Sequence, residues 1–129
     1  MASPAIVEPI IQKDIGDCAI ACLAMVLGLP YAEVCSVALA LYPTSSSKGL
    51  TTRQMFAVVR ALGRTLQSIP TKDTQLDAET GILDVRIGRR YHAVVLFEGV
   101  VINPADGLIY NLDTYLAARK ATPTRFFRP

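Results

Sequence analysis

One cysteine and one histidine define the chemistry that this sequence could perform. Cys18 follows a polar stretch and opens a run that is apolar almost throughout, and His92 is the single histidine of the chain. A cysteine nucleophile works best as a thiolate, and it needs an imidazole nearby together with a third group that orients the imidazole. Any imidazole base must therefore be His92. The pair indicates attack of a thiolate on a carbonyl carbon.

The helix that would carry Cys18 is bounded by Asp17 and Gly28. Asp is a preferred N-cap residue because its side chain can accept a hydrogen bond from an amide of the first turn. Residues 19–27 have no polar face, which is typical of a buried helix, and Gly28 is the expected stop. In the first turn, the helix dipole and the free amide groups favour a thiolate. We therefore predict a Cys18 thiol with a lowered pKa at the head of a central, buried helix.

A β-hairpin is expected to carry His92 and Asn103 at its open end. Residues 92–97 are β-branched and apolar, Glu98–Gly99 is a candidate two-residue turn, and residues 100–102 can run back. Counting inward from the turn places His92 within about two residues of the level of Asn103, where their side chains can face each other.

Three polar side chains could complete a site around Cys18 and His92. Asn103 could accept the imidazole N–H, fix its tautomer and leave the other nitrogen for Cys18, with Asp106 as the alternative orienting residue. Gln12 lies six residues before Cys18, and its amide could fold back beside the start of the helix. With the backbone N–H of Cys18 it would form an oxyanion hole.

The remaining elements predict a single α+β domain over residues 1–129, with helices first and an antiparallel sheet second. Further helices are expected at 31–41 and from Thr51 or Thr52 to about residue 62, with a loop at 43–49 between them. In the second half we expect strands at 64–69, 81–87 and 108–110, a short helix ending near Lys120, and a tail that adds an edge strand.

Composition and charge exclude several classes of protein. The 13 basic and 11 acidic residues nearly balance, and the longest basic run is Arg89–Arg90, so a nucleic-acid partner is not expected. The apolar run 19–29 is too short to span a bilayer, and the N-terminus does not resemble a signal peptide, so we expect a cytoplasmic protein without a transmembrane segment. Three cysteines with one histidine favour neither a disulfide framework nor a metal site, and no cofactor is expected.

Four separated motifs resemble those of the bacteriocin-processing cysteine peptidases, a papain-like family that removes double-glycine leaders. That family has a Gln six residues before the Cys of D-C-G-x-A-C-L-A-M, followed later by H-x-V-V-L and D-P-x-x-G. Here the corresponding residues are Gln12, DCAIACLAM at 17–25, HAVVL at 92–96 and NPADG at 103–107. The stretch KGLTTRQMFAVVRALG at 48–63 also looks like the third helix of the family.

The resemblance covers about residues 10–117 and implies a papain-like fold that hydrolyses peptide bonds after small residues such as Gly. It implies Cys18 as the nucleophile and His92 as the general base and acid. It further implies Asn103 as the residue that orients His92, and Gln12 as an oxyanion donor. The expected partner is a peptide or protein substrate.

Two positions depart from the family pattern. Ala19 stands where the family has Gly, which could crowd substrate backbone beside Cys18, and Asn103 stands where the family usually has Asp. We expect Asp17, Ala19 and Tyr91 to contact the substrate. Two alternatives remain open: an isopeptidase, amidase or acyltransferase that uses the same thioester chemistry, and a catalytically idle copy that binds a peptide or a partner protein.

Overall fold

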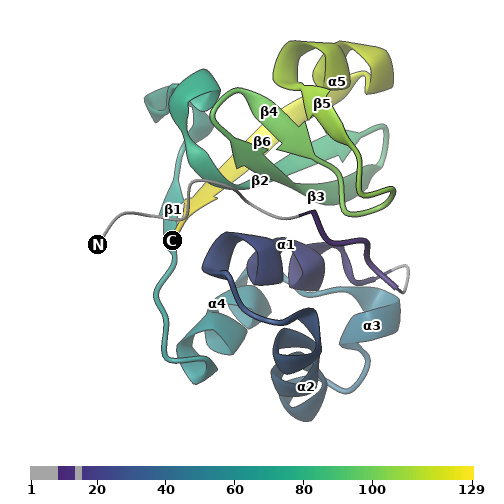
Figure 1. Cartoon of the computed structure of the whole chain (residues 1–129), viewed down its shortest axis with the longest axis vertical. Coiled ribbons are helices and arrows are strands. Elements are labelled where there is room, and N and C mark those ends of the chain that lie inside the picture. Colours follow the sequence, from purple (N-terminus) through teal and green to yellow (C-terminus); the bar gives the residue numbers. More distant parts are fainter. Residues whose placement is uncertain (1–8, 14–15) are drawn as a thin grey trace.

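A computed structural model describes residues 9–13 and 16–129 of the chain, apart from the side chain of Ser46. In the described part, helices α1 to α4 lie together on one side of an antiparallel sheet, and helix α5 lies on the other side (Figure 1). The predicted order of helices first and sheet second is therefore confirmed. Residues 1–8 and 14–15 of the predicted single domain lie outside the described residues.

The three long helices of the first half are present where the sequence predicts them. They are α1 (Cys18–Leu27), α2 (Tyr31–Leu41) and α4 (Thr52–Ala61). Helix α1 ends at Gly28, whose φ of 67° lies in the left-handed region that glycine adopts without strain. Eight of the ten residues of α1 are buried, as its lack of a polar face predicts.

The predicted loop at 43–49 contains a short helix, α3 (Ser45–Lys48), that the sequence pattern did not indicate. Local hydrogen bonds account for this difference. The Ser47 hydroxyl donates to the carbonyl of Thr44 at 3.1 Å, and the backbone N–H of Gly49 donates to the carbonyl of Ser45 at 2.9 Å. Serine side chains can close a single turn in this way without any amphipathic periodicity.

Helix α4 begins with a reciprocal capping box. The Thr51 side chain accepts a hydrogen bond from the Gln54 backbone N–H at 3.1 Å, and the Gln54 side chain accepts one from the Thr51 N–H at 2.9 Å. Thr51→Ala should therefore lower the free energy of unfolding by about 1 kcal/mol, measured by urea denaturation. Arg53→Ala, on the exposed face of the same helix, is the control and should change it by less than about 0.5 kcal/mol. Equal effects of the two substitutions would contradict the capping role.

The described residues form one six-stranded sheet in the order β1-β6-β2-β3-β4-β5, with every neighbouring pair antiparallel. The hairpin predicted around Glu98–Gly99 is present, and Phe97 pairs with Val100. Helix α5 (Leu112–Arg119) precedes the last strand. The strands are β1 (Gln67–Ile69), β2 (Thr80–Ile87), β3 (Arg90–Phe97), β4 (Val100–Ile102), β5 (Ile109–Asn111) and β6 (Ala121–Arg128).

The C-terminal strand β6 is not the edge strand that the sequence suggested. It lies between β1 and β2, and it pairs with both. The reason is visible in two adjacent side chains: Phe126 packs into the core beneath α5, whereas Phe127 packs into the core beneath α1. A strand that buries large side chains on both faces is most stable inside the sheet.

Candidate active site

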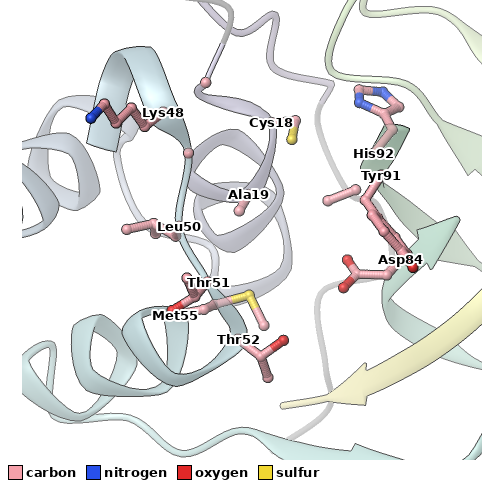
Figure 2. Close-up of a pocket in the computed structure, with 13 residues that line it drawn as sticks. Cys18, Ala19, Lys48, Leu50, Thr51, Thr52, Met55, Asp84, Tyr91 and His92 are labelled. Carbon is pink, nitrogen blue, oxygen red and sulfur yellow. The ribbon is translucent and has the colours of Figure 1, made fainter. Parts of the chain in front are cut away.

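The first turn of α1 brings Cys18 next to the beginning of β3. Strand β4 pairs with β3 along residues 95–97 and does not extend along residues 90–94. Cys18 and His92 both line two adjacent cavities at this place. Figure 2 shows the Cys18 thiol and the His92 ring on facing walls of the first of these cavities, with Ala19 and Tyr91 also at its margin.

His92 and Asn103 are in contact, as the hairpin register predicts. Nε2 of His92 lies 2.8 Å from Oδ1 of Asn103, and the Asn103 side chain is buried. The backbone N–H of Ala105 donates to the same Oδ1 at 3.1 Å, which identifies this atom as the acceptor oxygen. Nε2 of His92 must therefore carry the proton. In a neutral imidazole, Nδ1 is then the basic nitrogen.

Asp106, the alternative orienting residue, is engaged elsewhere. Its carboxylate accepts hydrogen bonds from the Tyr110 hydroxyl at 2.5 Å and from the Leu108 backbone N–H at 2.9 Å. Both contacts lie within the turn that follows Asn103. The carboxylate thus stabilises the turn, and Asn103 is the residue whose side chain contacts the ring of His92.

Gln12 lies at the second cavity together with Cys18, His92 and Asn103. Its backbone N–H donates to the carbonyl of Pro104 at 2.8 Å, which ties the segment before α1 to the turn after Asn103. Gln12 and Cys18 thus line the same cavity, and the role of the Gln12 amide as an oxyanion donor stays a prediction.

The expectation that the Cys18 thiol has a lowered pKa is wrong for the free protein. Burial raises the pKa of Cys18, and this effect exceeds the opposite effect of the backbone N–H groups of Ala93, Ala19 and Cys18 itself. Burial also lowers the pKa of His92, against the effect of the hydrogen bond to Asn103. Because the head of α1 packs on the sheet, desolvation outweighs the helix terminus. Both groups therefore rest in their neutral forms near neutral pH, and a proton must pass from thiol to imidazole during attack.

The other two cysteines differ from Cys18 in their surroundings. Cys22 is completely buried one turn further along α1, and burial raises its pKa well above the ordinary value. Cys35 is half-buried on α2 and packs at the margin of the core. Of the three cysteines, Cys18 alone lines the two cavities described above.

Asp17 does not cap α1 with its side chain. Its carboxylate instead accepts a hydrogen bond from the Tyr31 hydroxyl at the start of α2, and the residue is buried. This contact ties the beginning of α1 to α2. Of the three residues expected to contact substrate, Ala19 and Tyr91 line the first cavity, whereas Asp17 is not among its lining residues.

Asp84 is a site residue that the sequence reasoning missed. It lies on β2 opposite Ala93 of β3, and its carboxylate faces the first cavity near Cys18 (Figure 2). Burial raises the pKa of Asp84 from its ordinary 3.8 to about 6, although Arg125 opposes the shift. A signal was present in the sequence, because this acid interrupts the otherwise apolar run GILDV of a strand predicted to be buried.

The raised pKa of Asp84 predicts a pH-dependent effect on stability. The pKa of Asp84 is higher in the folded than in the unfolded state, so its ionisation destabilises the fold. This destabilisation grows as pH rises from about 4 to about 6 and has a constant size at higher pH. Asp84→Asn should therefore raise the free energy of unfolding by about 3 kcal/mol at pH 8 and change it little at pH 4. Urea denaturation at both pH values measures this, with the exposed Asp77→Asn as the matched control. Destabilisation at pH 8 would contradict the assignment.

Comparison with known proteins identifies the fold. No model of a known protein family matches the sequence, and no curated protein sequence matches it either. Among solved structures, the chain is similar to the peptidase domain of Streptococcus ComA, a bi-functional ABC transporter involved in a quorum sensing pathway. The TM-score is 0.62 over 95% of this chain and 96% of that one, at 17% sequence identity. The chain thus shares the α+β fold of that peptidase domain, with helices packed on an antiparallel sheet, which confirms the predicted fold class.

None of the helices in the described part of the chain combines the length and the apolar character that crossing a membrane requires.

Proposed function

We propose that the chain is a cysteine peptidase whose nucleophile is Cys18. The observation that carries the proposal is the hydrogen bond from His92 to Asn103, at the margin of a cavity shared with Cys18, in a fold similar to that of a peptidase domain. Acyl transfer requires three groups: a thiol, an imidazole held by an amide, and a backbone N–H at the start of a helix.

In the proposed first step, Sγ of Cys18 attacks the carbonyl carbon of a peptide bond while its proton passes to Nδ1 of His92. The Gln12 amide and the Cys18 backbone N–H stabilise the oxyanion. The C–N bond then breaks, and the imidazolium gives its proton to the leaving amine. An acyl thioester on Cys18 remains.

In the second step, water attacks the thioester while Nδ1 of His92 takes a proton from it. The C–S bond breaks, the peptide leaves with a new carboxyl group, and Cys18 regains its proton. Throughout both steps, Oδ1 of Asn103 accepts the Nε2–H of His92 and so keeps the ring orientation fixed. Neutral resting forms of Cys18 and His92 mean that charge develops only as the bond to the substrate forms.

The proposed cleavage site follows a small residue such as Gly. Ala19, immediately after the nucleophile, is buried and lines the first cavity, where its methyl group narrows the space beside Cys18. A substrate residue without a side chain fits such a restricted position better than a bulky one. This specificity also follows from the resemblance to the peptidases that remove double-glycine leaders.

Incubation with a synthetic peptide library in ¹⁸O-labelled water tests the proposal and separates it from its alternatives. A peptidase yields fragments whose new C-terminal carboxyl carries ¹⁸O, and Cys18→Ala abolishes them. An acyltransferase instead yields products joined to an added amine, without the label. Peptides that bind but remain intact would mean a catalytically idle copy of the fold and would overturn the proposal.

A further inference from the structure

The carboxylate of Asp84 occupies a position at the site that the proposed catalytic steps do not use. Its register partner on β3 is Ala93, the residue after His92, so it lies one strand away from the imidazole. Figure 2 shows the carboxylate directed into the first cavity, on the wall opposite α4. A substrate held for attack by Cys18 must pass close to this group.

Among residues 9–13 and 16–129, no hydrogen bond or ion pair compensates the charge of the Asp84 carboxylate. Arg125, its register partner on β6, forms no ion pair with it within 4.0 Å, although its positive charge lowers the pKa of Asp84 and so offsets part of the cost of burial. Lys48 lines the same cavity, but its ammonium points away from Asp84 (Figure 2). With a pKa of about 6, Asp84 is mostly charged at neutral pH. A partly buried carboxylate without a partner is costly, and a ligand cation would relieve that cost.

The rest of the cavity suits a long side chain with a charged end. Leu50 and Met55 provide apolar surface, and Thr51 and Thr52 lie beside them on the same wall. Lysine and arginine have an aliphatic stem that packs on apolar groups and a cationic head that seeks a carboxylate. The cavity measures about 260 Å³, is open to solvent and has Cys18 among its lining residues.

We propose that Asp84 forms a subsite for a positively charged side chain of the substrate peptide, close to the bond that is cleaved. This inference rests on the proposed peptidase function and adds the substrate class to it. A substrate of this kind has a lysine or arginine near a small residue, and the ion pair with Asp84 fixes the register of the peptide against Cys18.

The subsite is tested with matched peptides that contain a Gly-Gly step. In each pair of peptides, one position around this step is lysine in one peptide and norleucine in the other. Norleucine keeps the aliphatic stem and removes the charge. At one position the wild-type protein should prefer lysine by about tenfold in kcat/KM, measured by mass spectrometry of the products. Asp84→Asn should bring this ratio close to one, and Asp77→Asn, which removes an exposed carboxylate outside the cavity, should leave it unchanged.

Binding of the same fluorescently labelled peptides, followed by anisotropy, separates failure of the subsite from failure of the peptidase function. If no peptide is cleaved but lysine peptides bind more tightly than norleucine peptides in an Asp84-dependent way, the subsite stands and the peptidase function fails. If peptides are cleaved but the ratio is unaffected by Asp84→Asn, the peptidase function stands and the subsite is overturned. A carboxylate that recognises only substrate backbone would give this second result.

Discussion

Cys18→Ala will lower kcat/KM for peptide hydrolysis by about 10⁴-fold or more, because the substitution removes the atom that forms the thioester. The variant keeps the oxyanion donors and the substrate cavity and can still bind a peptide. It has no nucleophile, however, and therefore cannot form the covalent thioester intermediate. Quantitative mass spectrometry of product formation, with the peptide that the library identifies, measures the loss. The fold should survive, since alanine has high helix propensity and removes only a sulfur atom at the rim of the cavity.

Cys35→Ala is the matched control for this prediction. It also removes one thiol from a half-buried position on a helix, but Cys35 lies on α2, away from the two cavities. Its activity should stay within about twofold of wild type. Comparable losses in both variants would indicate damage to the fold, and retained activity in Cys18→Ala would contradict the role of Cys18.

His92→Ala will lower kcat/KM by about 10³-fold, because it removes the imidazole that takes the proton of Cys18 and returns it to the leaving amine. Asn103→Ala should cost less, about 10- to 100-fold, since it loosens the imidazole without removing it. The same product assay measures both variants. Thermal unfolding of each variant separates lost chemistry from lost stability.

The double variant His92→Ala/Asn103→Ala provides the decisive control. Because Asn103 acts through His92, its removal should have no further effect once the imidazole is absent. Additive losses would mean that Asn103 contributes independently of His92, and the hydrogen bond between them would then lack the proposed role.

Much of the fold is predictable because local signals specify it. Helix α1 has an unbroken apolar run that ends at a glycine, and the hairpin of β3 and β4 has β-branched residues around a two-residue turn. The position of β6 could not be predicted in this way, because it depends on which distant strands accept Phe126 and Phe127. The order of strands in the sheet depends on packing between segments that are far apart in the sequence, so no local sequence pattern predicts it.

The candidate site shows the same division between local and long-range information. Counting along the hairpin was sufficient to predict the contact of His92 with Asn103, because register within a hairpin is set by its turn. The pKa of Cys18 was mispredicted, because desolvation depends on how closely α1 packs against the sheet. Asp84 was missed for a related reason: only the pairing of β2 with β3 brings it near Cys18.

The pairing of Cys18 with His92 is tested most directly by reaction with limiting iodoacetamide at pH 7. Mass spectrometry then locates the labelled residue. The three cysteines serve as internal comparison, because Cys22 is buried and Cys35 is half-buried away from the imidazole. We predict that His92→Ala lowers the rate of Cys18 labelling about tenfold, because the imidazole that takes the thiol proton during attack is removed, and that it leaves the rate of Cys35 labelling unchanged. A Cys18 rate that His92→Ala leaves unchanged, or an equal loss of rate at Cys35, would contradict the proposed catalytic pair.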